Sequence, residues 1–188
     1  MTRIYGSAMA ALMCLSLSAV PAIAGTQDAA MKDFTHRVKA YMELRRHAAE
    51  PVPPLSLSWD AQMLAARADA LADAIRAARQ AAKVGDIFSP EIVVAFQDRI
   101  GDALRRHAYD AADVLYDVTS DAPALRTVPK VNGRFDWTFG ALMPGCVITA
   151  LPPLPDELQY RFIGQDLVLV DIDAGLIVDI LPLALSIN

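Results

Sequence analysis

Two aspartates near the C-terminus have the spacing of a carboxylate pair on one face of a β-sheet. Asp171 and Asp179 lie in an otherwise apolar run from Leu167 to Leu181. The tripeptide Asp173-Ala174-Gly175 interrupts this run and is typical of a three-residue hairpin loop. In the resulting hairpin both carboxylates share a face at diagonal positions, with backbones about 7 to 8 Å apart. Acid and base pairs occur at such separations, so these two residues are the candidates for carboxylate catalysis.

Arg161 is predicted to join this carboxylate pair. A short strand from Tyr160 to Phe162 precedes the hairpin, and its aromatic residues suit the opposite, apolar face. Because side chains alternate along a strand, Arg161 then points to the face of Asp171 and Asp179. A neighbouring guanidinium keeps carboxylates ionised and denies them the raised pKa that a general acid needs. The pattern therefore favours structural, salt-bridged carboxylates, and a functional polar site on the sheet face is the alternative.

A second candidate site consists of basic residues near two predicted helix ends. The pentapeptide Leu-Arg-Arg-His-Ala occurs at 44–48 and again at 104–108. Basic residues at helix C-termini stabilise the helix dipole, which explains them without a ligand. If three helices run up, down and up, however, the first and third end at the same pole. The six side chains would then form an anion-binding pole: Arg45, Arg46, His47, Arg105, Arg106 and His107.

Motifs for other chemistry are missing from the sequence. It contains no G-x-S-x-G, H-E-x-x-H or C-x-x-C motif, no phosphate-binding loop and no dinucleotide fingerprint. We therefore expect no cofactor and no metal ion. Cys146 would be the only cysteine after loss of the N-terminal leader, and it is expected to be a buried apolar residue or an intermolecular disulfide partner.

The first half of the chain, about 30–117, is predicted to be helical. Apolar residues recur every three or four positions over 31–48, and prolines at 51, 53 and 54 end that helix. A second helix is expected to start after Ser58 and to end at Gly85. Ser89 and Pro90 predict the start of a third helix, which can continue to Tyr116.

The second half, about 128–188, is predicted to be rich in β-structure. Asn132-Gly133 predicts a tight turn, and residues 144–151 suit a helix or a strand, with the helix favoured because Pro144 can begin it. The hairpin register is expected to pair Ile172 with Leu176, Val170 with Val178 and Val168 with Ile180. The predicted fold is α+β, with about three antiparallel N-terminal helices packed on the apolar face of a small C-terminal antiparallel β-meander.

Residues 1–24 have the features of a cleaved signal peptide. Arg3 precedes a short apolar segment, and Ala22-Ile23-Ala24 fits a small-x-small cleavage site. Residues 25–188 would then form a single exported domain, periplasmic or secreted, with no membrane span in the mature chain. From 108 to 188 the sequence has 4 basic and 11 acidic residues, and the whole chain carries a formal charge of -5. This balance argues against a nucleic-acid partner.

Several motifs resemble those of a group of uncharacterised exported proteins of Gram-negative bacteria. They are the NGRF string at Asn132, Met143-Pro144, the C-terminal run LPPLPDELQYRFIGQDLVLVDIDAGLIVDIL and the segment 81–96, AAKVGDIFSPEIVVAF. The resemblance implies export and a common fold, and it carries no assigned activity.

These features favour a non-catalytic interaction or accessory module that contacts a protein partner or an anionic ligand. One alternative is a carboxylate-dependent enzyme that uses Asp171 or Asp179, and another is an anion-binding protein that uses the basic pole. A homo-oligomer is also compatible with the sequence, since Leu169 and Ile177 are expected on the second face of the meander, where a partner could cover them.

Overall fold

The computed structural model describes residues 20–54, 60–120, 128–137 and 143–185, and its fold is α+β, as the sequence predicts. Helices make up the N-terminal part, and a three-stranded antiparallel sheet lies near the C-terminus. The elements in chain order are α1 (Val20–Ala49), α2 (Ala61–Ala78), α3 (Pro90–Arg106), α4 (Ala111–Ser120), α5 (Gly145–Ala150), β1 (Leu158–Ile163), β2 (Asp166–Asp171) and β3 (Leu176–Leu181).

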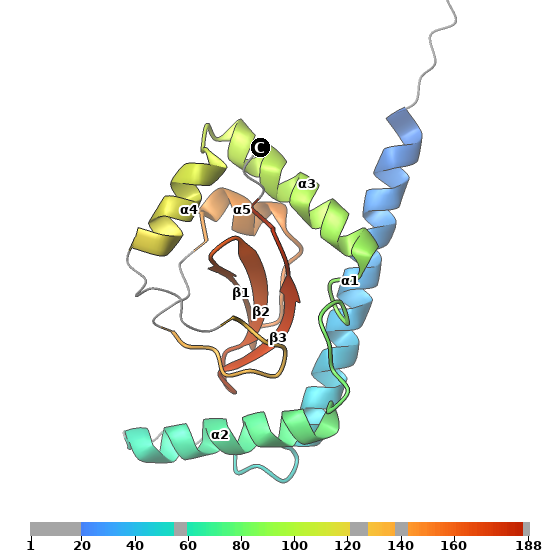
Figure 1. Ribbon diagram of the computed structural model, residues 1–188. Helices are drawn as coiled ribbons and strands as arrows, with labels where there is room; N and C mark the ends of the chain where they lie inside the picture. The colour runs from blue at the N-terminus through green and yellow to red at the C-terminus, as the bar shows by residue number, and fades with distance from the viewer. Residues whose placement is uncertain (1–19, 55–59, 121–127, 138–142, 186–188) are drawn as a thin grey trace, which may run out of the picture.

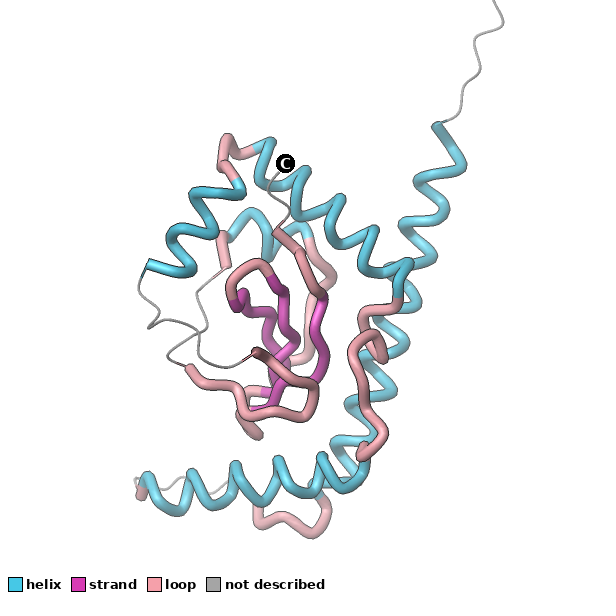
Figure 2. The backbone as a smooth tube through the Cα atoms, viewed as in Figure 1, coloured by secondary structure: helices cyan, strands magenta, loops and turns pink. Residues whose placement is uncertain are grey.

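The helices surround the sheet rather than forming a parallel-sided bundle. Figure 1 shows α1 passing along one side of the sheet, α3 crossing one end of it and α2 extending across the foot of α1. The backbone tube in Figure 2 shows the irregular segment between α2 and α3 running back along α1. Within the described ranges, no helix has both the length and the apolar character that a membrane crossing requires.

Several helix boundaries follow from local sequence. Pro90 begins α3 as predicted, because its missing N–H is not needed in the first turn. Asp60 caps α2 by accepting the N–H of Gln62 at 2.9 Å, whereas the expected cap, Ser58, lies outside the described residues. Residues 145–150 form a helix, which confirms the favoured alternative. Ala108, with a φ of 54°, separates α3 from α4, so the third helix does not continue to Tyr116.

The sheet has the strand order β1-β2-β3, and its register departs from the predicted one at a single point. Val168 pairs with Ile180 as expected, but a β-bulge between Leu169 and Val170 shifts the remaining pairs. Asp171 consequently pairs with Leu176, and the loop contains four residues, 172–175, instead of three. Gly175 has a φ of 57°, the left-handed conformation that glycine adopts at low cost.

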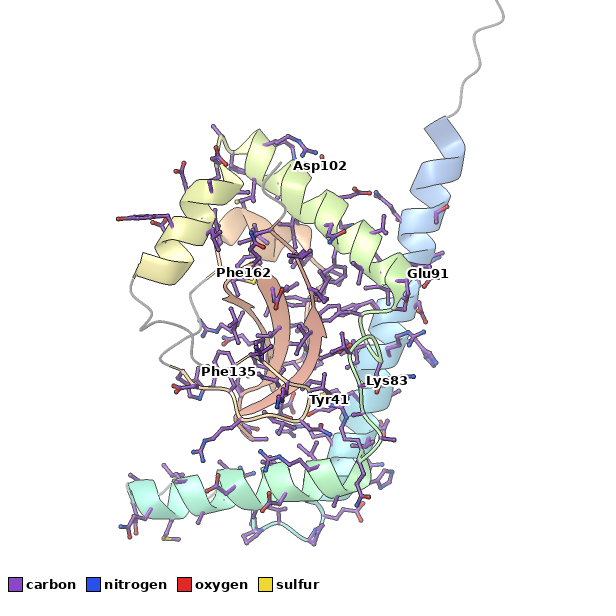
Figure 3. All side chains as sticks on the ribbon, in the orientation of Figure 1. Tyr41, Lys83, Glu91, Asp102, Phe135 and Phe162 are labelled. Atoms are coloured by element: carbon purple, nitrogen blue, oxygen red, sulfur yellow. The ribbon has the colours of Figure 1, made fainter. Side chains whose placement is uncertain are left out.

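The main core lies between the helices and the sheet face that carries the two aspartates. Tyr160 and Phe162 pair with Leu169 and Leu167, so they share that face. The Phe34 ring of α1 lies 4.9 Å from the Phe96 ring and within stacking distance of Tyr160. Figure 3 shows Tyr41 and Phe162 among the side chains that fill this space. The prediction that the helices pack on the Val168 face was therefore wrong, because the aromatic residues of β1 lie on the other one.

A smaller apolar cluster covers the second face of the sheet. It is made by six buried side chains: Phe135, Ile163, Val168, Val170, Ile177 and Ile180. Leu169 and Ile177 are both buried, on opposite faces, so they do not form the exposed apolar surface that the sequence suggested for self-association.

Candidate functional site

Asp171 is buried beneath α1, at the end of β2. Its carboxylate accepts hydrogen bonds from the Tyr41 hydroxyl at 2.9 Å, from Arg45 Nε at 2.6 Å and from the backbone N–H of Ala174 at 3.1 Å. Arg45 reaches further and donates from Nη2 to Asp173 at 2.7 Å. One arginine of α1 therefore holds a buried carboxylate and the hairpin loop together.

Asp179 is buried as well, and its partners are backbone N–H groups. Oδ1 accepts from Gly85 at 3.0 Å and from Ile180 at 2.8 Å, and Oδ2 accepts from Ile87 at 2.7 Å and Phe88 at 2.8 Å. Four donors thus surround the two oxygens. The segment that leads into α3 is fixed to β3 by this one side chain.

Arg79 lies between these two carboxylate sites. Its Nη1 donates to the carbonyl of Val178 at 2.9 Å, and its guanidinium lies 5.3 Å from the centre of the Tyr41 ring. Burial lowers the pKa of Arg79 and raises that of the Tyr41 hydroxyl, which therefore stays a hydrogen-bond donor to Asp171. Tyr41 and Arg79 were not identified from the sequence. The spacing of Tyr41 and Arg45, four residues apart on one helix face, was the available signal.

Arg161 does not join the carboxylates, so the predicted three-residue cluster is not formed. Arg161 pairs with Val168, on the face opposite Asp171 and Asp179. It donates from Nε and Nη2 to Gln159 Oε1 at 3.0 and 2.7 Å, and its guanidinium lies 5.6 Å from the centre of the Trp137 ring. The two aspartates do share one face of the sheet, as predicted, but each binds different partners: Asp171 binds Arg45, and Asp179 binds backbone N–H groups.

The predicted anion-binding pole is also not formed. The α1 and α3 helices end at opposite ends of the molecule, because α3 runs back past the sheet after the 79–89 segment (Figure 1). Arg45 is buried against Asp171, and the exposed Arg46 and His47 contact neighbouring glutamates on α1. In α3, Arg105 pairs with Asp102, Arg106 donates to the Asp102 carbonyl, and His107 caps the helix end.

The geometry of the two aspartates does not suit catalysis. Neither Asp171 nor Asp179 has solvent-accessible surface, so neither carboxylate can reach a substrate in this conformation. Every one of their oxygens already accepts a hydrogen bond from the protein. Across the described ranges, no group of three or more His, Cys, Asp or Glu side chains is arranged to hold a metal ion.

The pH dependence of stability is expected to reveal the burial of Asp179. Burial raises the pKa of this carboxyl group, and the four N–H donors offset part of that rise. Between the ordinary and the raised pKa the folded state therefore binds more protons than the unfolded state. The stability of the wild type relative to Asp179→Asn should increase as the pH falls from 7 toward about 4, and decrease again as the pH rises.

Urea unfolding of both proteins across this pH range measures the difference. If the stability of the wild type relative to Asp179→Asn decreased as the pH fell, the four hydrogen bonds would outweigh desolvation and the pKa of Asp179 would be lowered.

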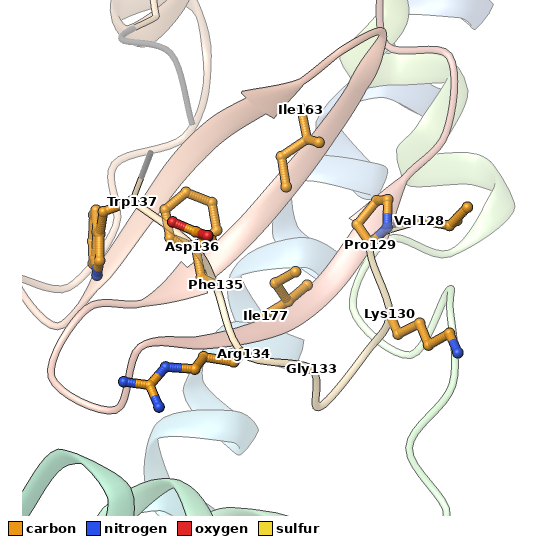
Figure 4. A pocket seen from close by; sticks show the side chains of 10 residues that line it. All are labelled: Val128, Pro129, Lys130, Gly133, Arg134, Phe135, Asp136, Trp137, Ile163 and Ile177. Atoms are coloured by element: carbon orange, nitrogen blue, oxygen red, sulfur yellow. The ribbon is translucent and has the colours of Figure 1, made fainter. Parts of the chain in front are cut away.

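An open cavity lies on the other face of the sheet. It has a volume of about 620 Å³, and the segment 128–137 forms most of its wall. Figure 4 shows the ten lining residues: Val128, Pro129, Lys130, Gly133, Arg134, Phe135, Asp136, Trp137, Ile163 and Ile177. Phe135, Ile163 and Ile177 are buried and form an apolar floor. Val128 is 76% exposed and Trp137 49% exposed, so two large hydrophobic side chains stand at the rim.

Backbone pairing with β3 fixes the cavity wall in place. Ile177 donates to Gly133 and accepts from Asn132, both at 2.9 Å, and Phe135 donates to Gly175 at 2.8 Å. Asn132 has a φ of 63° at the predicted turn, and a Cβ on Gly133 would lie only 2.7 Å from the Lys130 carbonyl oxygen. The turn therefore requires glycine.

Sequence reasoning did not identify this cavity. Large aromatic side chains are mostly buried in a core, but Trp137 lies at the cavity rim, where it makes a T-shaped contact with Phe135. Cys146 is partly buried and packs against the main core.

Comparisons with known proteins do not assign the chain to a family. No protein-family model matches the sequence. No curated protein matches it, and no solved structure matches the fold.

Proposed function

We propose that this protein is an exported, non-catalytic binding module that holds an external ligand in the cavity on the second face of its sheet. The observation that carries the proposal is the cavity itself. Its volume of about 620 Å³ lies within the range of small-molecule sites, and it combines an apolar floor with a few charged side chains at the rim. Two exposed hydrophobic residues, Val128 and Trp137, would lose contact with water when a ligand binds.

The roles of the two aspartates support a non-catalytic function. Asp171 joins α1 to the hairpin, and Asp179 joins the 85–88 segment to β3, so both serve to hold elements together. A carboxylate-dependent enzyme would need at least one of them at a surface. The basic pole offers no alternative, because its two halves lie at opposite ends of the molecule.

The sequence of residues 1–24 supports export, because it combines a basic residue, a short apolar segment and a small-x-small site. The mature protein would begin at Gly25 and act in the periplasm or outside the cell. Binding to a protein partner and homo-oligomerisation remain predictions made from the sequence.

Binding of N-phenyl-1-naphthylamine, a neutral apolar dye, tests the cavity as a binding site. We expect saturable binding that Val128→Asp weakens about tenfold or more, because a ligand that covers the new carboxylate must desolvate it. Val94→Asp is the matched control, since Val94 is 59% exposed on α3 and does not line the cavity. Equal dye binding by the two variants, or no saturable binding by the wild type, would contradict the proposal.

A further inference from the structure

We propose that the ligand of this cavity is an amphipathic anion: an apolar body that covers the floor, and a carboxylate, sulfate or phosphate head bound by Lys130 or Arg134. This inference rests on the proposed function and names the chemical class of ligand. It follows from the charges around the cavity and from the way they are already paired.

Basic residues gather around the cavity in a half of the chain that is otherwise acidic. Residues 108–188 contain 4 basic residues against 11 acidic ones. Lys130 and Arg134 line the cavity, and Arg161 lies directly behind its rim, against Trp137. The fourth, Arg126, lies outside the described residues. Three of the four cations in this half therefore surround one apolar hollow, which favours a ligand of negative charge.

The two lining cations are available to a ligand. They are exposed and lie on either side of the turn at Gly133 (Figure 4). The only ion pair of Arg134 with another described residue is with Asp69 at 3.4 Å, and both side chains are largely exposed, so the pair contributes little and can be exchanged. Lys130 forms no ion pair with any described residue. The two side chains extend in opposite directions from this turn (Figure 4), so an anionic head could bind either one without breaking a strong interaction.

The opposite end of the cavity disfavours an anionic head. Asp136 lies there beside Phe135 and Trp137, and its carboxylate adds negative charge to that end. The Trp137 ring could bind a ligand cation through its π-face, but the Arg161 guanidinium already lies 5.6 Å from its centre. An amphipathic anion is therefore expected to place its head at the Gly133 turn and its apolar body over Ile163 and Ile177.

A series of ligands with one tail and different heads tests this inference. The probes are decanoate, decanol and decyltrimethylammonium, each used below the concentration at which it aggregates. Trp59→Phe leaves Trp137 as the single tryptophan, so its fluorescence reports on the cavity. We expect decanoate to bind at least about tenfold more tightly than decanol, decyltrimethylammonium to bind most weakly, and added salt to reduce the preference for decanoate.

The double variant Lys130→Gln/Arg134→Gln should remove the preference for decanoate while decanol binding is retained. Arg46→Gln/Arg105→Gln is the matched control, because it removes the same charge from two exposed arginines elsewhere and should leave the preference intact. Equal binding of decanoate and decanol, or tightest binding of decyltrimethylammonium, would contradict the proposal that the ligand is an anion. Either result would still be compatible with a binding site in this cavity. Absence of binding by all three probes, or decanoate binding that survives Val128→Asp, would overturn the proposed site as well.

Discussion

Arg45→Met is expected to lower the free energy of unfolding by about 3 to 5 kcal/mol, because it leaves the Asp171 carboxylate buried without a counter-charge. Arg45 is 9% exposed and Asp171 is fully buried, so water cannot replace the lost guanidinium. The Tyr41 hydroxyl and the Ala174 N–H would be the remaining hydrogen-bond donors to this carboxylate. Urea unfolding measures the loss.

The chain supplies a matched control one residue away. Arg46 is exposed on the same helix and pairs with Glu43 at 3.1 Å, a contact that solvent screens. Arg46→Met should therefore change the free energy of unfolding by about 1 kcal/mol or less. Similar losses for the two variants would show that Arg45 stabilises the fold by its general position on α1, not through Asp171.

A second substitution distinguishes the buried charge from the lost contacts. Asp171→Asn in the Arg45→Met background removes the unpaired charge, while the amide can accept from the Ala174 N–H and donate to the Tyr41 oxygen. We expect this double variant to be more stable than Arg45→Met alone by about 1 to 3 kcal/mol, a coupling of the size seen for directly contacting residues. A double variant less stable than Arg45→Met would mean that the unpaired charge is not the main cost.

Asp179→Asn is expected to lower the free energy of unfolding by about 2 to 4 kcal/mol, although the side chain keeps its shape. An ionised carboxylate only accepts hydrogen bonds, and here each oxygen meets two backbone N–H donors. An amide satisfies one pair of donors and turns its own NH₂ group toward the other pair. Two N–H groups then lose their acceptor, whichever way the amide is turned, and at least one of them is buried.

The Asp179→Asn substitution should also allow the 85–88 segment to open locally more readily than the rest of the fold. Amide hydrogen exchange at Ile87 and Phe88 is expected to accelerate in Asp179→Asn, because these N–H groups bond directly to the carboxylate. Asp73→Asn is the control: Asp73 is an exposed carboxylate that pairs with Arg76 on α2, and its loss should cost less than about 1 kcal/mol. Unchanged exchange at both amides would contradict the role assigned to Asp179.

These two aspartates explain how the helices are attached to a small sheet. Each fills a position on a strand where an apolar residue would otherwise pack, and each binds a segment more than 90 residues earlier in the chain. The 128–137 segment covers the opposite face of the sheet only in part, and the uncovered part forms the cavity. The sheet face that carries Asp171 and Asp179, where the sequence suggested possible catalysis, thus has a structural role. The opposite face, which the sequence indicated only as apolar, carries the proposed binding site.

The sequence by itself determined the features that depend on neighbours along the chain. Pro90 began α3, Gly175 adopted the left-handed turn conformation, residues 145–150 formed a helix, and period-two alternation put Asp171 and Asp179 on one face. Each of these follows from the backbone preferences of one residue or from spacing within one element.

Only the tertiary structure decided which charge meets which and which sheet face the helices cover. Arg45 and Asp171 are 126 residues apart, and among 17 basic and 22 acidic residues no local pattern selects that pair. The bulge after Leu169 and the placement of Tyr160 and Phe162 against Phe34 depend on packing between elements, as does the cavity beside Trp137. Such contacts are selected by the burial of complementary surfaces in three dimensions, and local sequence patterns do not encode them.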